Sequence, residues 1–391
     1  GTVLTRYRSS WLLTDASSAL IADGCVDVED GLVSWSGPVA EAPPSDAAVV
    51  EHDGLLMPGF VNAHCHTPMV LLRGAGEGLP VDRWLHEVMW PREARLTPDD
   101  VYWGMLLGAA EQLLHGVTTT NEMYFHVPHM AAAATEVGIR TVLGAPLIDV
   151  PDRFGPIDAQ FEAALDFAKQ READPLVSIV LGPHSTYAVS RSILEQVAEV
   201  ARSADLAVHI HIAEMGNENE LSKSNHGLPL VEFLDTVGLL GPHLMAAHGV
   251  WLDAADRERL AGHSVGVLHC PSSNLRHANG IAPVVAHRAA GLPVGLGTDG
   301  PASAPMLDMF TEMRLAAGLA RGSGLDPAAL EATDVLAMAT TEGATALGRD
   351  DIGALTPGRR ADMVALDISR STYHPVVEPA DIVTHLVWGG M

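Results

Sequence analysis

Two histidines separated by one residue stand in a short apolar stretch, 57–66, which reads MPGFVNAHCH. The stretch has the composition of a buried strand, and side chains two residues apart point to the same face of a strand. His64 and His66 therefore aim together, and two imidazoles aimed at one point can share a metal ion. Such a pair is weak evidence by itself in a chain with 19 histidines. Its meaning depends on whether the chain supplies further ligands.

Further candidate ligands stand near the ends of later β-rich runs. His211 lies near the end of the run 207–212, and Asp299 ends the run 294–299. With His64 and His66 they supply three imidazoles and a carboxylate, which suits a catalytic zinc ion, with iron as the alternative. A two-metal site would need a bridging group, often a modified lysine, and the fourth β-rich run, 177–184, contains no lysine. We therefore expect one metal ion.

Acid–base candidates lie close to these ligands in the sequence. Glu214 follows His211 by three residues, where a side chain can return over the site and move protons between water and a substrate. His248 ends the run 244–248, and this position favours a functional role over that of a core histidine. His209 is interpreted as a polar packing residue one layer below His211.

Four other residues near the run ends are less easily assigned. Cys65 points away from the face that His64 and His66 share, so we interpret it as a packing residue. His269 and Cys270 fit the lining of a site and the core about equally well. Asn274 could cap a helix or a loop instead of contacting a substrate.

Eight short β-rich runs alternate with Ala- and Leu-rich helical stretches from residue 57 onwards. This alternation predicts an α/β protein with a closed parallel (β/α)8 barrel of the TIM type over residues 57–352. Active sites of such barrels lie at the C-terminal ends of the strands, which is where the candidate residues fall. The runs are 57–66, 116–121, 140–144, 177–184, 207–212, 244–248, 265–270 and 294–299.

The two ends of the chain have a different pattern. Residues 1–56 and 353–391 contain short apolar runs broken by turn residues, and we expect them to form one small β-sandwich domain together. The closing run Ile382–Trp388 is interpreted as one of its strands. Because a sheet usually needs further strands, we expect the natural chain to continue beyond Met391.

Composition limits the classes of partner. The chain of 391 residues has 49 acidic and 23 basic side chains and a formal net charge of −26, which argues against binding to nucleic acid or to an anionic membrane. No apolar run approaches the roughly 20 residues of a membrane span, and the N-terminus lacks the pattern of a signal peptide. The 3 cysteines are far apart, which favours a reduced, cytoplasmic setting.

The stretch 57–66 resembles the opening signature of the amidohydrolase superfamily. Further motifs extend the resemblance over nearly the whole chain and are similar to those of its S-adenosylhomocysteine, methylthioadenosine and adenosine deaminase branch. The resemblance implies a mononuclear zinc enzyme that converts a small-molecule purine nucleoside and water to the inosine analogue and ammonia. Assembly into a homo-oligomer stays open. The motifs are GPHS at 182–185, HIAE at 211–214, AHGVW at 247–251 and GTDG at 297–300.

The resemblance also implies roles for individual residues. Glu214 matches the residue that contacts the purine N1 and moves protons, and His248 matches the residue that orients the attacking water. Asp299 matches a catalytic position as well as a metal position. The positions that match metal ligands are His64, His66, His211 and Asp299.

Substrate contacts follow from the same resemblance. His184 matches a contact to the purine ring, and Glu93 falls where the family places a glutamate on the ribose hydroxyls. Without the resemblance, Glu93 would be interpreted as an exposed helix charge. Homocysteine-accepting relatives have an arginine where this chain has Ala145, and Arg153 matches a second family arginine. Adenosine, methylthioadenosine and 5′-deoxyadenosine are therefore favoured over S-adenosylhomocysteine.

Two other functions share part of this pattern. A guanine-type deaminase or a triazine hydrolase would use the same metal ligands, but it would have no ribose diol for Glu93 to bind. A barrel that has lost its metal and serves as a scaffold is a non-enzymatic alternative, and the complete ligand set argues against it.

Overall fold

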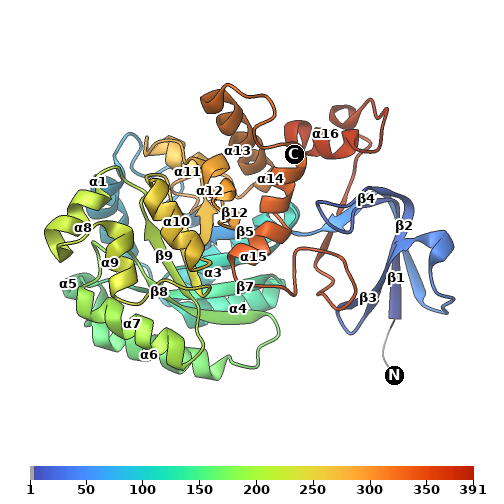
Figure 1. The fold of residues 1–391 in the computed structure, drawn as a ribbon. Coiled ribbons are helices and arrows are strands. Elements are labelled where there is room, and N and C mark those ends of the chain that lie inside the picture. The colour runs from blue at the N-terminus through green and yellow to red at the C-terminus, as the bar shows by residue number, and fades with distance from the viewer. Residues whose placement is uncertain (1–3) are drawn as a thin grey trace.

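The computed structural model describes residues 4–391, and its core is a sheet of eight parallel strands (Figure 1). The spatial order of the strands follows their order in the chain, as the alternation of β-rich and helical stretches predicted. The fold is therefore the predicted (β/α)8 type. The strands are β5 (Phe60–Cys65), β6 (Val117–Met123), β7 (Arg140–Leu147), β8 (Val177–Pro183), β9 (Val208–Ile212), β10 (Leu244–His248), β11 (Gly266–His269) and β12 (Val294–Leu296).

Hydrogen bonds join β5, the first strand, to the residues that directly follow β12, the last strand. The Asn62 amide donates to the Thr298 hydroxyl over 2.8 Å, and the Thr298 N–H donates to the Asn62 side-chain oxygen over 3.0 Å. The Asp299 N–H donates to the main-chain oxygen of His64 over 2.9 Å. This seam places Asp299 directly beside His64, although the two residues stand far apart in the chain.

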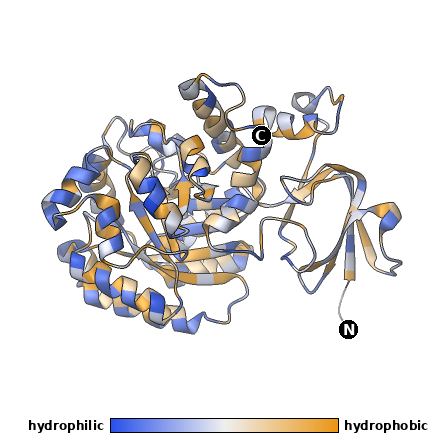
Figure 2. Ribbon diagram, in the orientation of Figure 1, coloured by the Kyte–Doolittle hydropathy of each residue, from blue (hydrophilic) through white to orange (hydrophobic). Residues whose placement is uncertain are grey.

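Helices cover the outside of the strands. In α7 (Arg191–Ser203) the buried residues Ile193, Leu194, Val197 and Ala198 recur at three- and four-residue spacing, as expected of a helix with one apolar face. Figure 2 shows hydrophobic and hydrophilic colours side by side on α7 and α6 (Ile157–Gln170). The other longer helices are α3 (Pro98–Leu114), α4 (Val127–Val137), α8 (Glu218–His226), α9 (Leu230–Thr236), α10 (Ala254–Gly262), α12 (Val284–Ala289), α13 (Met309–Gly324), α14 (Ala332–Met338) and α15 (Thr341–Ala346).

The segment between β5 and α3 covers the C-terminal mouth of the barrel. The backbone at Gly76 has a φ of +75°, and a Cβ there would lie 2.4 Å from the Trp84 ring, so a glycine is required. The Trp84 indole N–H donates to the main-chain oxygen of Ala75 over 3.0 Å. This packing holds the Glu93-bearing turn over the ends of the strands. The segment forms η2 (Thr67–Leu72), α1 (Val81–Arg83), the π-helix η3 (Trp84–Met89) and α2 (Trp90–Glu93).

Both ends of the chain contribute to a second, five-stranded sheet beside the barrel (Figure 1). Its order is β13-β4-β1-β2-β3, in which β1 and β4 pair in parallel and the other neighbours are antiparallel. The Arg140 side chain ties it to the barrel through an ion pair with Asp362, 2.7 Å long. The sheet and its connections contain β1 (Leu4–Leu12), β2 (Ile21–Glu29), β3 (Leu32–Pro38), η1 (Val39–Glu41), β4 (Ala48–Pro58), β13 (Met363–Leu366) and η4 (Ser371–Tyr373).

The prediction of a strand at Ile382–Trp388 is wrong, because these residues lie in helix α16 (Asp381–Gly389). Its buried residues are Ile382, Val383, Leu386 and Val387. This four-residue recurrence fits the period of a helix and not the alternation of a strand. The helix packs against α13 and α14 of the barrel instead of extending the small sheet.

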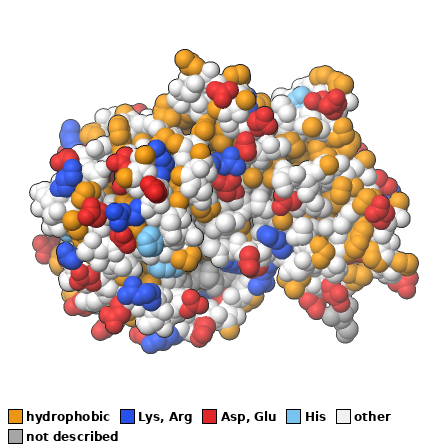
Figure 3. Space-filling model, viewed as in Figure 1, with side chains coloured by type: hydrophobic (Ala, Val, Ile, Leu, Met, Phe, Trp, Pro, Cys, Tyr) orange, Lys and Arg blue, Asp and Glu red, His pale blue; other side chains and the backbone are white. Residues whose placement is uncertain are grey.

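The surface agrees with the acidic composition. Acidic side chains are scattered over the face shown in Figure 3. Among residues 4–391, no helix combines the length and the apolar character needed to cross a bilayer.

Candidate metal and proton-transfer site

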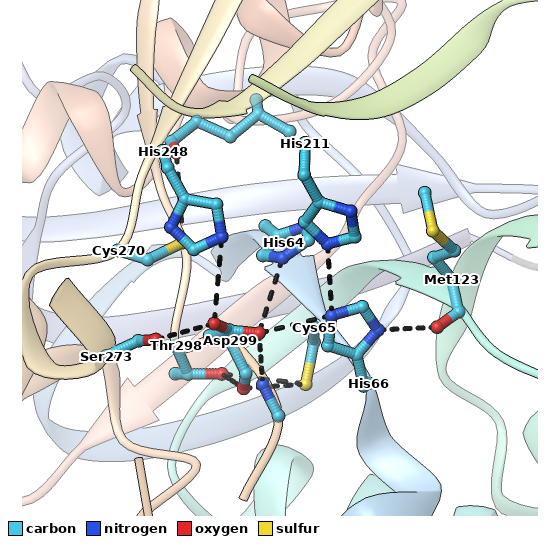
Figure 4. A network of polar contacts seen from close by, with 12 residues as sticks. His64, Cys65, His66, Met123, His211, His248, Cys270, Ser273, Thr298 and Asp299 are labelled. Atoms are coloured by element: carbon cyan, nitrogen blue, oxygen red, sulfur yellow. Dashed lines mark hydrogen bonds and ion pairs between the residues drawn. The ribbon is translucent and has the colours of Figure 1, made fainter. Parts of the chain in front are cut away.

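Three histidines and an aspartate from three strands meet at the mouth of the barrel (Figure 4). His64 belongs to β5, His66 follows it, His211 belongs to β9, and Asp299 stands just after β12. Asp299 Oδ1 lies 3.3 Å from His64 Nε2 and 3.2 Å from His66 Nε2. The Nε2 atoms of His66 and His211 are 3.4 Å apart. The structure thus brings together the four residues that the sequence suggested as ligands.

These separations are those of atoms that surround one ion. Zinc bonds of about 2.0–2.1 Å in a tetrahedron place neighbouring ligand atoms about 3.3–3.4 Å apart. His64 Nε2 is buried and has no hydrogen-bond partner, although such an atom is costly to leave unpaired. A metal ion would satisfy it, so the geometry and the chemistry of the donor set both fit a single metal ion.

The Nδ1 atom of each of the three histidines makes a polar contact on the side of the ring away from the candidate metal position. His66 Nδ1 donates to the main-chain oxygen of Met123 over 2.5 Å, and His211 Nδ1 donates to that of His184 over 2.7 Å. His64 Nδ1 lies 2.8 Å from Nε2 of His209. With the Nδ1 atoms engaged, the three Nε2 atoms keep the lone pairs that a metal ion needs. His209 lies one layer below the site, as expected, but it also contacts a candidate ligand.

Asp299 is fixed in an unusual backbone conformation. Its φ is +59°, a region that non-glycine residues seldom adopt. Its Oδ1 accepts from the Gly300 N–H and its Oδ2 from the Ser273 hydroxyl, each over 2.7 Å. Burial alone would raise the pKa of Asp299, but His64 and His66 outweigh burial and hold this pKa well below its usual range. The carboxyl group is therefore ionised.

Two further titratable groups face the free side of this cluster. His248 Nε2 lies 3.7 Å from Glu214 Oε2 and 3.8 Å from Asp299 Oδ2. Both Glu214 and His248 are buried, and burial raises the pKa of Glu214. The carboxyl group of Glu214 can therefore hold a proton closer to neutral pH than an exposed glutamate can.

One segment after β11 orients these groups, and the sequence did not reveal this role. It contains α11 (Pro271–Arg276) and the turn that follows. The His248 Nδ1–H donates to the Asn274 side-chain oxygen over 3.0 Å, and the Asn279 amide donates to Glu214 Oε1 over 3.1 Å. Asn274, for which a cap was one interpretation, thus contacts a site residue. The NxxxxN spacing at 274–279 gave no local signal of this arrangement.

A second carboxylate, Glu218, fixes the backbone that carries Glu214. It accepts from the N–H groups of Ala213, Glu214 and Met215 over 2.8, 2.8 and 2.9 Å. Burial raises the pKa of Glu218 to about 7. Glu218 was not among the residues that the sequence pattern suggested. The one available signal was a glutamate four residues after the end of the HIAE motif, at the first position of a helix, where it can bind preceding N–H groups.

The site opens into a small pocket of about 50 Å3, next to a larger cavity of about 390 Å3. His184 and Trp90 line the pocket near the candidate metal ligands, while Arg153 and Ala145 line the larger cavity only. Glu93 lines both spaces. Arg153, in α5 (Pro151–Phe154), is exposed and does not line the pocket beside the candidate ligands.

Glu93 is buried, so its interpretation as an exposed helix charge does not hold. Burial raises its pKa to about 7, although the Tyr124 hydroxyl lowers it in part. A buried carboxyl group at the junction of two cavities is placed to accept hydrogen bonds from a ligand.

The remaining candidates lie apart from the pocket. Cys65 Sγ is 3.3 Å from the Thr67 hydroxyl and does not line the pocket, in agreement with a packing role. His269 and Cys270 are buried and are also absent from its lining.

Comparisons with known proteins agree with this geometry. Residues 55–390 match the amidohydrolase family. The chain is 42% identical over 362 residues to the 5′-deoxyadenosine deaminase of Methanothermobacter thermautotrophicus, covering 92% of this chain and 84% of that protein. It is 38% identical over 382 residues to the 5-methylthioadenosine/S-adenosylhomocysteine deaminase of Pelotomaculum thermopropionicum, covering 96% and 87%. A crystal structure of an adenosine deaminase from Xanthomonas campestris with bound zinc has a TM-score of 0.94 and 35% identity, covering 98% of this chain and 88% of that chain.

Proposed function

Because the chain belongs to the amidohydrolase family, we propose that it is a zinc-dependent hydrolytic deaminase of adenosine or a 5′-modified adenosine. The observation that carries the proposal is the position of His248. Its Nε2 lies within 3.8 Å of both Glu214 and Asp299, beside a metal-ligand cluster. This arrangement supplies a metal site, a proton donor and a proton acceptor around one point, which hydrolysis of an aromatic amine requires.

The protein groups have separate tasks in this reaction. A bound zinc ion supplies Lewis acidity that makes water nucleophilic at neutral pH. His64, His66, His211 and Asp299 would hold that ion. His248, whose Nδ1–H is fixed on Asn274, presents Nε2 to orient the attacking water. Asp299 Oδ2 faces the same space and takes a proton from the water.

Glu214 supplies the proton that activates the ring. Its raised pKa allows the protonated carboxyl group to donate to the purine N1, which makes C6 electrophilic. After water has added to C6, the proton that Asp299 has taken passes to the amino group, and the C6–N bond breaks to release ammonia. His184 lines the pocket, and burial lowers its pKa to about 3, so it contacts the purine as a neutral ring.

The cavities support a nucleoside with a 5′ group that carries no charge. Glu93 stands where the pocket meets the larger cavity, a suitable place to hold the ribose hydroxyls. The larger cavity is lined by Phe125, Phe154 and Ala145, with Arg153 as its one arginine. Methylthioadenosine and 5′-deoxyadenosine therefore suit it better than S-adenosylhomocysteine. A guanine-type base or a triazine would leave Glu93 without a partner.

An ammonia-release assay over a panel of 5′-modified adenosines, with adenine, guanine and a chlorotriazine as comparison substrates, tests the proposal. We expect turnover of the nucleosides and little turnover of the others. Glu214→Gln should keep the bound metal, measured by elemental analysis, and lose most turnover. Near-normal turnover in this variant, or a preference for free bases, would overturn the assignment.

A further inference from the structure

His209 contacts the metal-ligand cluster from below. It lies in β9 two residues before His211, so its side chain points to the same face of the strand. His209 and His64 are both fully buried. The ring centroids are 4.9 Å apart with the planes at 85°, and His64 Nδ1 lies 2.8 Å from His209 Nε2. This edge-on arrangement suits an N–H of one ring pointing at a ring nitrogen of the other.

The direction of this hydrogen bond follows from the chemistry of the cluster. His64 Nε2 faces Asp299 Oδ1 at 3.3 Å and needs its lone pair to bind a metal ion, so the ring hydrogen of neutral His64 is on Nδ1. His64 therefore donates and His209 Nε2 accepts. The hydrogen of His209 is then on Nδ1, a buried atom with no hydrogen-bond partner among the residues that the structure describes.

We propose that His209 is a positioning residue of the metal site, which fixes the tautomer and ring orientation of His64 and thereby sets the metal affinity. His66 and His211 donate instead to the main-chain oxygens of Met123 and His184. His64 thus differs from the other two histidines in having a side chain as its partner. Loss of such a partner behind a metal-bound histidine typically weakens metal binding 10- to 100-fold.

The two histidines of the His-x-His pair are held by different kinds of partner. The main-chain oxygen of Met123 holds His66 directly. His64 is held instead by the side chain of His209. This arrangement gives His209 a defined task that a packing residue would not have.

Three substitutions of His209 show whether His64 needs the accepting nitrogen or only a side chain that fills the same space. In His209→Gln the side-chain oxygen can reach the position of Nε2 and still accept from His64. In His209→Asn the amide corresponds to Nδ1 and cannot reach His64, while His209→Leu has no acceptor. His287→Leu is the matched control, because His287 is a buried histidine whose Nε2 donates to the Gly249 oxygen over 2.8 Å, outside the ligand set.

The measurement is the zinc dissociation constant, obtained by competition with a chromophoric chelator and independent of any substrate. We expect the Leu and Asn variants at position 209 to bind zinc 10- to 100-fold more weakly, and the Gln variant and the control to stay within about threefold of the unmodified protein. Circular dichroism of the metal-free proteins checks folding. If the Leu variant fails to fold, the zinc dissociation constants of the Gln and Asn variants still test whether the accepting atom matters.

Two outcomes would overturn the inference. Zinc affinity within about twofold of the unmodified protein in the folded Asn and Leu variants would show that His64 needs no partner at this position. A loss in the Gln variant as large as that in the Asn variant would show that the accepting atom does not matter. Because no turnover is measured, neither outcome depends on the proposed deaminase reaction.

Discussion

Asn279 offers a sharp test of how Glu214, the proposed proton-transfer group, is held. Its amide donates to Glu214 Oε1, while its main-chain oxygen accepts from the Trp251 indole N–H over 2.7 Å. Asn279→Ala removes the amide and keeps the main-chain contact. Glu218 continues to hold the backbone at Glu214, so the expected change is a loss of side-chain orientation and not of the loop.

The size of the effect follows from the hydrogen bond that is lost. A bond to a charged group contributes about 1.5–3 kcal/mol. The Asn279–Glu214 distance of 3.1 Å is longer than that of the strongest charge-assisted bonds, so the lower end applies. A loss of about 1.5 kcal/mol in the transition state lowers kcat/KM roughly tenfold.

A double-mutant cycle with Glu214→Gln distinguishes this role from a general structural one. If Asn279 acts through the Glu214 carboxyl group, Asn279→Ala should cost about tenfold in the unmodified background and almost nothing when Gln occupies position 214. Asn219→Ala, which removes the side-chain acceptor of the Leu230 N–H and leaves the contacts that Asn279 and Glu218 make with Glu214, serves as control and should change kcat/KM little. Equal losses from Asn279→Ala in both backgrounds would refute the reasoning.

Two other predictions address the substrate and the stability. Ala145→Arg would add a guanidinium to the cavity that Arg153 also lines. The ratio of kcat/KM for S-adenosylhomocysteine to kcat/KM for methylthioadenosine should therefore rise about tenfold. An unchanged ratio in competition assays would contradict this placement of the 5′ group. Burial raises the pKa of Glu312 from 4.5 to about 8, so its protonated form favours folding at low pH, and this contribution is lost as the pH rises from 4.5 toward 8. Glu312→Gln should therefore raise the Tm by roughly 2–4 °C at pH 9 and much less at pH 5. Equal Tm shifts at the two pH values, measured by thermal unfolding, would show that the pKa of Glu312 is not raised.

Local patterns in the sequence were sufficient to predict the barrel and much of the candidate site. Alternating β-rich and helical stretches predicted the eight strands, because hydrophobic period and run length are properties of neighbouring residues. Parallel strands place their carboxyl ends at one rim, so strand-end residues such as His211 and Asp299 could be expected to meet. The same kind of reasoning failed at residues 382–388, where a short apolar run fits a strand and a buried helix equally well.

The identity of the candidate ligand residues was therefore a property of the sequence, while the contacts that support them were decided by tertiary structure. Nothing local to Asn279 indicates that it reaches Glu214, and nothing local to His209 indicates that its accepting nitrogen meets His64. Hydrogen-bond partners depend on which distant strands and turns become neighbours, and on side-chain directions that close packing selects. The sequence by itself determined which side chains are available for chemistry at the rim of the barrel. The tertiary structure decided which other atoms hold those side chains in place.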